Sequence, residues 1–196
     1  MGRAWTRGVA RATWGVWVSA ERLPSAVALV AHVVGQLAPR GAVGVRSAAA
    51  MHGLLEAPDV LDVVVPRTHS RSIASWPFAH RCFVVTSRAG DDQHVCLPVE
   101  QDLFLTLTAR YRTVVDLVRF RSTVGELTAS LALRRILDAG GELALLEHLA
   151  RGHRASTGLA RLLPIARALP PPPPVLDCRP LVFAAGHPER VPPFTR

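Results

Sequence analysis

The chain has 196 residues, 49% of them hydrophobic, and a formal net charge of +8 at pH 7. This length accommodates one domain of ordinary size with a buried core, and the apolar content excludes disorder throughout. All 23 basic residues are arginine, which excludes a lysine-dependent nucleotide site such as a GxxxxGK[ST] phosphate loop. The net positive charge favours an acidic partner, either nucleic acid or an acidic protein, although charge alone assigns no function.

Residues 1–22 combine arginines with three tryptophans and show no clean hydrophobic period. We interpret them as a basic N-terminal arm, either disordered or the remnant of an upstream element. From Pro24 the pattern predicts a helix to about Ala38, which the "PRG" at residues 39–41 stops. The apolar run of this helix, "AVALVAHVV", is much shorter than the roughly twenty residues of a membrane span. No membrane association is therefore expected.

A second helix, "RSAAAMHGLL", is predicted from Arg46, with Ser47 as its N-cap and with His52 and Gly53 at its end. Strands are predicted at residues 59–66, 78–86 and 94–100. The "AGDDQ" turn at residues 89–93 predicts that the second and third strands form a hairpin. Pro98 places the third strand at an edge of the sheet or ends it there.

Everything beyond Leu103 is predicted to be helical. Thr113 is interpreted as the cap of a helix to about Arg121, and Thr123 with Glu126 as a capping box for the next helix, which ends at "AGG" (residues 139–141). Two more helices are predicted, at residues 142–152 and from Ser156 onward, the last of which must kink or break at Pro164.

The predicted fold class is α+β, with a small, mostly antiparallel sheet of about three strands packed against several helices and a helical C-terminal half. The domain is expected to span residues 23–169. The "PPPPP" at residues 170–174 favours a stiff polyproline conformation that buries no core. Residues 170–196 are therefore expected to be a disordered Pro-rich tail.

Catalytic motifs are sparse. The histidines at positions 52, 69, 80 and 94 show no metal-ligand spacing. Glu100 and Asp102 are the only acidic pair that suggests the edge of a nuclease core, and no lysine accompanies them. We predict no catalytic residue, no cofactor and no metal, so the protein is not expected to be an enzyme.

The three cysteines, Cys82, Cys96 and Cys178, match neither a zinc pattern nor a CxxC motif. Each is predicted to be a small buried hydrophobic residue. Unpaired cysteines favour a reducing compartment, and the expected location is the cytoplasm.

Asp116 is the most informative single charge. It lies among four apolar residues of a predicted helix, one turn from both Arg112 and Arg119. Because an unpaired buried carboxylate costs several kcal/mol, the sequence predicts an ion pair between Asp116 and one of these arginines. This structural interpretation is favoured over catalysis.

Three segments between about residues 30 and 169 resemble the C-terminal domain of AbiEi-type antitoxins from type IV toxin–antitoxin systems. The helix with Ser47, His52 and Gly53 is similar to the family's "SAAALHGL" helix. Residues 112–117, which include Thr113 and Asp116, read "RTVVDL", and this motif is similar to one in the family. The stretch "FRSTVGELTASLALRR" resembles a following family helix. The order and spacing of the three segments carry the resemblance more than any one of them.

The resemblance implies an antitoxin-like regulator that opposes a nucleotidyltransferase-like toxin and contacts duplex DNA as an autorepressor. About thirty residues precede the similarity, fewer than the roughly 60 that a winged helix domain needs, so DNA contact is expected without such a domain. Arg110, Arg121, Arg134 and Arg135 are the predicted nucleic-acid or partner contacts. Two alternatives remain open: a degraded restriction-endonuclease-like nuclease, and a protein-interaction module without DNA binding.

Overall fold

The computed structural model describes residues 9–13, 16–19, 31, 34, 41–66, 80–85, 93–100 and 103–173. The strands are β1 (Val9–Thr13), β2 (Val16–Ser19), β3 (Ala42–Val43), β4 (Leu61–Pro66), β5 (His80–Val85), β6 (His94–Glu100) and β7 (Leu103–Thr108). The helices are α2 (Val45–Met51), α3 (Arg110–Arg119), α4 (Arg121–Val124), α5 (Glu126–Asp138), α6 (Leu143–Gly152) and α7 (Ser156–Ala168). The fold is α+β with a helical C-terminal half, as predicted.

The sheet is larger than predicted and it is mixed. Five strands lie in the order β5-β4-β3-β7-β6. β4 pairs with β5 and β3 with β7 in parallel, whereas β3 and β4 are antiparallel, as are β6 and β7. The prediction of about three, mostly antiparallel strands was therefore wrong in strand number and in pairing, although the strand predicted at residues 59–66 is present as β4.

The predicted hairpin between the second and third strands is not formed, because β5 and β6 lie at opposite edges of the sheet. β6 instead pairs with β7, a strand within the region predicted to be wholly helical. Pro98 is tolerated because β6 is an edge strand, as its sequence indicated, and the pairing register shifts between Pro98 and Glu100.

The two ends of the chain are described in part. Inside the segment interpreted as a basic arm, β1 and β2 form a two-stranded antiparallel sheet. Ala31 and Val34 are helical and buried, and the rest of the helix predicted from Pro24 lies outside the described residues. At the other end the structure describes Pro170–Pro173 of the predicted tail, and the tail from residue 174 onward lies outside it.

The three predicted N-caps are wrong. The residues at the N-cap positions of α2, α3 and α5 are Gly44, Ala109 and Gly125, whose side chains cannot cap a helix. Ser47 and Thr113 lie inside their helices, Thr123 belongs to α4, and Glu126 begins α5. The hydroxyls of Ser47 and Thr113 bond to groups of the sheet, which is why their cap patterns misled.

Three helices end in the same way, with one residue of left-handed backbone after the C-cap. Gly53 after α2 has a φ of 69° and Gly140 after α5 has a φ of 80°, as the sequence indicated. After α6 this position is Arg154, with a φ of 56°. The next amide bonds back to the helix each time: Leu54 to Ala49, Gly141 to Ile136 and Ala155 to Ala150.

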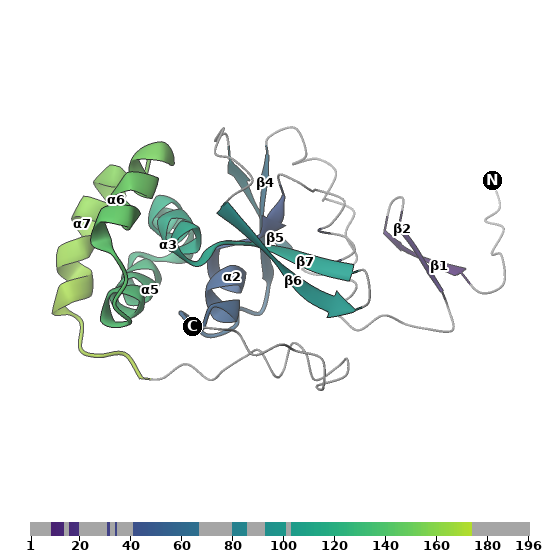
Figure 1. Ribbon diagram of the computed structural model, residues 1–196, viewed down its shortest axis with the longest axis horizontal. Coiled ribbons are helices and arrows are strands. Elements are labelled where there is room, and N and C mark those ends of the chain that lie inside the picture. Colours follow the sequence, from purple (N-terminus) through teal and green to yellow (C-terminus); the bar gives the residue numbers. More distant parts are fainter. Residues whose placement is uncertain are drawn as a thin grey trace.

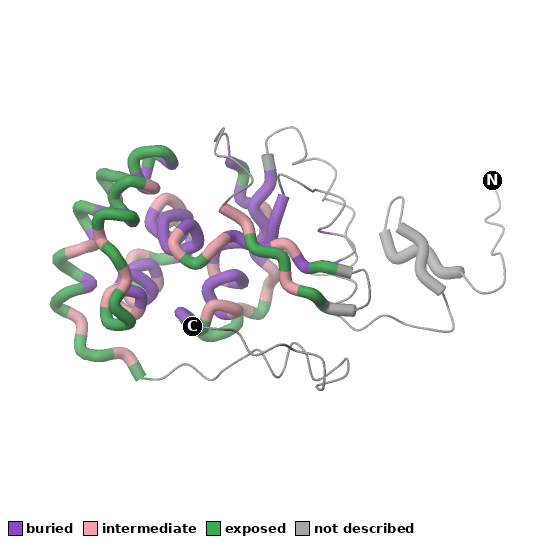
Figure 2. The backbone as a smooth tube through the Cα atoms, in the orientation of Figure 1, coloured by how far each residue is buried: buried purple, intermediate pink, exposed green. Residues whose placement is uncertain are grey.

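The main core lies between one face of the sheet and the helices, as Figures 1 and 2 show. Val64 and Phe83 of the sheet pack with Leu117 of α3 and Leu133 of α5 in this core. α7 runs through Pro164 without a break, and a break was one of the two predicted outcomes at this residue. In a regular helix the N–H of residue 164 bonds to the carbonyl of Ala160, and proline has no N–H. Both residues are exposed, so this carbonyl is open to hydrogen bonding with water.

Candidate functional site

Asp116 forms the ion pair that its sequence context predicted. Arg112 Nε donates to Asp116 Oδ2 at 2.9 Å, and both side chains are buried. Burial raises the pKa of Asp116, while the neighbouring Arg112 guanidinium opposes that rise. Asp116 Oδ1 has no hydrogen-bond partner among the described residues. The pair is a structural element of the helical half and does not face a cavity that the structure describes.

The same arginine reaches two polar side chains that sequence reasoning missed. Arg112 Nη1 donates to Gln93 Oε1 at 2.8 Å, and His153 Nε2 lies 2.6 Å from that oxygen. His153 Nε2 also lies 3.1 Å from Arg112 Nη1. A protonated Nε2 donates to Gln93, whereas an unprotonated Nε2 accepts from Arg112, so the tautomer decides which of the two contacts is a hydrogen bond. Burial, followed by the charges of Arg112 and Arg119, lowers the pKa of His153 to about 4. These residues therefore tie α3 to the start of β6 and the end of α6.

Two family-motif positions join α2 to the sheet. Ser47 Oγ accepts the backbone N–H of Asp62 at 2.9 Å, and His52 Nε2 donates to the carbonyl of Thr108 at 2.8 Å. Burial lowers the pKa of His52, which keeps the ring neutral and its Nε2–H available as a donor. Ser47 thus fastens α2 to β4, and His52 fastens the end of α2 to the end of β7.

Thr113 makes the corresponding joint for α3. Its hydroxyl lies 2.7 Å from Thr108 Oγ1 and 3.0 Å from the carbonyls of Thr108 and Ala109. Thr113 donates its single proton to one of those carbonyls at a time, while Thr108 Oγ1–H donates to Thr113. Together, Ser47, His52 and Thr113 connect the sheet to the first helices, and we call these three residues the sheet–helix joint.

A second ion pair lies beside this joint and was not predicted. Arg46 donates from Nε and Nη2 to the carboxylate of Asp62 at 2.9 and 3.2 Å. Asp62 is fully buried on β4. The signal in the sequence was Asp62, which stands inside the apolar run "DVLDVVVP". A buried carboxylate at such a position requires a partner.

Three of the four predicted contact arginines make hydrogen bonds within the chain, and two of them, Arg121 and Arg134, lie away from the pocket described below. Arg134 pairs with Asp138 at 2.7 Å and also donates to the carbonyl of Arg167 at 2.9 Å. Arg121 lies 3.9 Å from Glu126 and donates to the carbonyl of Val118 at 3.3 Å. Both guanidinium groups help to hold α7 and the α3–α5 region together, and neither lines the pocket described below.

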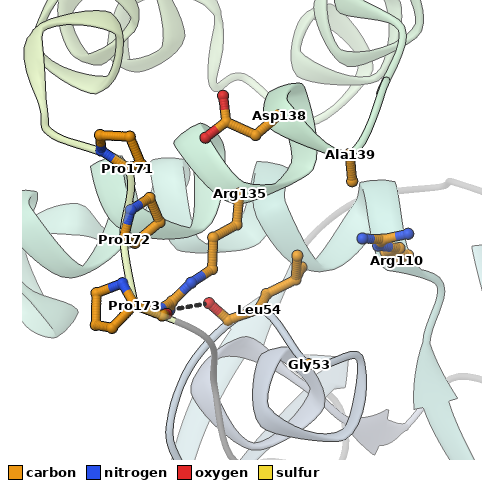
Figure 3. A pocket seen from close by; sticks show the side chains of 9 residues that line it. All are labelled: Gly53, Leu54, Arg110, Arg135, Asp138, Ala139, Pro171, Pro172 and Pro173. Atoms are coloured by element: carbon orange, nitrogen blue, oxygen red, sulfur yellow. Dashed lines mark hydrogen bonds between the residues drawn. The ribbon is translucent and has the colours of Figure 1, made fainter.

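The other two arginines, Arg110 and Arg135, line one pocket of about 370 Å³. Its walls are the end of α2, the start of α3, the end of α5 and the proline segment after α7 (Figure 3). The lining residues are Gly53, Leu54, Arg110, Arg135, Asp138, Ala139 and Pro171–Pro173. The structure therefore brings Gly53, a family-motif position, together with two of the predicted contact residues.

Arg135 is the centre of this pocket. Nη1 donates to the carbonyl of Leu54 at 2.7 Å, and Nη2 donates to the carbonyl of Pro173 at 2.8 Å. Arg110 is exposed, and within the described part of the chain its guanidinium has no hydrogen-bond partner. The pocket thus has one arginine held between two carbonyls and a second arginine facing solvent.

The groups considered for catalysis are not brought together as a site. Glu100 lies at the end of β6, whereas Asp102 and His69 lie outside the described residues. In the part of the chain that the structure describes, no group of three or more His, Cys, Asp or Glu side chains has a metal-binding arrangement. The prediction of buried cysteines was wrong for Cys96, which is exposed, while Cys82 is half-buried and Cys178 lies outside the described residues.

Among the described residues, no helix is both long enough and apolar enough to cross a membrane. A scan against protein-family models gives no match for this sequence, and a search of curated proteins gives none either.

Proposed function

We propose that the protein is a non-enzymatic, antitoxin-like regulator of the AbiEi type that acts in the cytoplasm against a nucleotidyltransferase-like toxin. The observation that carries the proposal is the set of contacts made by the residues behind the resemblance. Ser47, His52 and Thr113 form the sheet–helix joint, and Asp116 is held by Arg112. These polar residues are few, and each forms a specific hydrogen bond, so their joint occurrence in the family's order supports the proposal more than any apolar match.

Contact with duplex DNA is the second part of the proposal. Residues 110–169 contain ten arginines and five acidic residues, and the arginines at positions 110, 151, 154, 161 and 167 are exposed. Such a surface attracts phosphates without reading bases. The expected binding is therefore dependent on salt and independent of sequence unless a further element supplies base contacts.

The antitoxin part is tested by co-expression with the nucleotidyltransferase-like product of a neighbouring gene. The protein should restore growth, and Thr113→Val combined with Asp116→Asn should reduce the rescue, because it weakens the core that presents the contact surface. Arg161→Gln, an exposed change, serves as the control. Full toxicity in the presence of abundant, folded protein would rule out the antitoxin function.

The DNA part is tested by mobility-shift titration of a duplex at low and moderate salt. Retention should weaken by orders of magnitude between about 50 and 200 mM salt if several phosphates are contacted. Absence of retention at the lower salt removes DNA from the proposal and leaves a protein-interaction module. Metal-dependent cleavage that is lost on replacement of Glu100 and Asp102 would replace the proposal with the nuclease alternative.

A further inference from the structure

The proline segment forms one side of a cationic pocket, and Arg135 connects the two. Arg135 uses one N–H for the carbonyl of Leu54 and another for the carbonyl of Pro173. Figure 3 shows Pro171–Pro173 on one side of the pocket and Arg110 on the other, with Arg135 between them. A guanidinium has five N–H donors, so these two hydrogen bonds leave donors on Arg135 unused.

The charge of the pocket is positive. Its only acidic lining residue, Asp138, accepts a 2.7 Å hydrogen bond from Arg134, which offsets its charge. Burial lowers the pKa of Arg135, but an arginine stays protonated in proteins. Arg110 and Arg135 therefore present two guanidinium groups to an open depression of about 370 Å³. The nearby charge of Glu56, which is outside the lining, acts on Arg135 and raises its pKa.

We propose that this pocket binds a phosphate group, and that Pro170–Pro173 is a removable strap over it. The phosphate takes the Arg135 hydrogen bond that the carbonyl of Pro173 now accepts, and Arg110 meets it from the opposite wall. Arginine is suited to this exchange, because a phosphate accepts two parallel N–H bonds from one guanidinium where a carbonyl accepts one. Within the described residues, the carbonyl of Pro173 is the group through which the strap bonds to Arg135, so the strap is a weak competitor.

The phosphate group can belong to a free phosphate compound or to the backbone of a nucleic acid. Only the nucleic-acid source rests on the proposed function. The experiment therefore uses the full-length protein with two probes, inorganic phosphate at constant ionic strength and a duplex of about 20 base pairs. Phosphate binding is measured as the rise of the thermal midpoint with concentration, since a ligand stabilises the state that binds it.

Four variants separate the roles of the pocket residues. Arg110→Gln removes the exposed arginine, which has no partner within the described residues to lose. Arg135→Gln removes the central arginine together with its bond to Leu54. A triple change of Pro171, Pro172 and Pro173 to serine loosens the strap in the intact chain. Arg167→Gln is the charge-matched comparison: it leaves the pocket lining intact, and in the duplex experiment it measures the loss that one exposed arginine of the general basic surface causes.

The phosphate response is expected to disappear in Arg110→Gln and Arg135→Gln and to persist in Arg167→Gln. The strap variant should bind phosphate about three- to tenfold more tightly, because a serine segment has more conformational freedom than a polyproline one, so the carbonyl of residue 173 occupies Arg135 for less of the time. If the duplex behaves in the same way, nucleic acid is the source; if only inorganic phosphate does, the ligand is a small phosphate compound.

A phosphate response that is absent from the native protein and from the strap variant, together with equal duplex retention by Arg110→Gln and Arg167→Gln, overturns the proposal. That result leaves the regulator function standing if toxin rescue succeeds. Conversely, a failed rescue combined with an Arg110-dependent phosphate response overturns the proposed function and supports the pocket.

Discussion

At the residue scale, the buried pair of Arg112 and Asp116 decides much of the stability of the helical half. Both side chains are almost fully buried, at 4% and 0% exposure. Arg112→Ala should destabilise the fold by about 3–5 kcal/mol, because it leaves an uncompensated carboxylate in the core. Urea denaturation measures the change. As a control, Arg161→Ala breaks an exposed pair with Glu126 and should cost less than about 1 kcal/mol of stability. Equal losses of stability in the two variants would show that the burial of Asp116 does not cause the destabilisation.

His153 makes stability dependent on pH. Its folded pKa of about 4 lies below its ordinary value of 6.5, so its contribution to stability is complete above pH 6.5 and is lost as the pH falls towards 4. The loss is at most about 3 kcal/mol, since one pKa unit corresponds to about 1.4 kcal/mol. The rise in the pKa of Asp116 acts in the opposite direction, so the comparison must be made between variants.

The test is the free energy of unfolding of the native protein and of His153→Gln between pH 7 and 4. The native protein should lose stability relative to the variant across this window. His148→Gln, an exposed histidine of α6, controls for histidine removal in general. Parallel curves for the native protein and His153→Gln would contradict the prediction.

Local contacts were predictable at this scale and distant ones were not. Arg112 and Asp116 are one helical turn apart, so spacing alone indicated the pair. Gln93 is 60 residues from His153, and no periodicity connects them. The same limit explains why Arg135 was predicted as a contact residue without its bonds to Leu54 and Pro173.

At the element scale, the end of α6 carries local strain. Arg154 occupies the left-handed position that glycine fills after α2 and α5, and a side chain there costs about 1 kcal/mol. Arg154→Gly should therefore stabilise the protein by about that amount, as measured by the denaturant midpoint. The charge of Arg154 also acts unfavourably on Arg119, which contributes in the same direction.

Two further variants isolate the backbone effect. Arg154→Ala removes the charge but keeps the left-handed residue non-glycine, so it should gain less than Arg154→Gly. Gly53→Ala should lose about 1 kcal/mol from its positive φ alone, because an added Cβ meets no atom within 4 Å there. A larger gain from alanine than from glycine at position 154 would attribute the effect to charge.

The elements themselves were predictable where a local signal was unambiguous. Glycines marked the ends of α2 and α5, and the β-branched run marked β4. β7 was missed although "LFLTLT" alternates, with Leu105 and Leu107 buried and Phe104 exposed. The N-caps failed because the threonine and serine hydroxyls had tertiary partners, which compete with capping.

At the scale of the whole molecule, the pairing of strands was beyond sequence reasoning. The parallel strands β4 and β5 are separated in the sequence by residues 67–79, and β6, the next strand after β5, lies at the opposite edge of the sheet. A turn signal indicates that the chain reverses but does not identify which strand will be its neighbour. Val63 and Val65 are buried on one face of β4 and Val64 on the other, so β4 is an inner strand, but this pattern does not identify its neighbours either.

The sheet–helix joint predicts that the sheet and the helices unfold together. Thr113→Val keeps the shape of the side chain but removes the hydroxyl that bonds to Thr108 at the end of β7. The cost should be about 1–2 kcal/mol, since a buried hydroxyl of Thr108 loses its partner. Hydrogen exchange should then accelerate by about 5- to 30-fold at protected amides of both β4 and α5. Thr128→Val, on the half-buried side of α5, is the matched control. Faster exchange in α5 alone would mean that the helical half opens independently and that Thr113 stabilises α3 rather than joining it to the sheet.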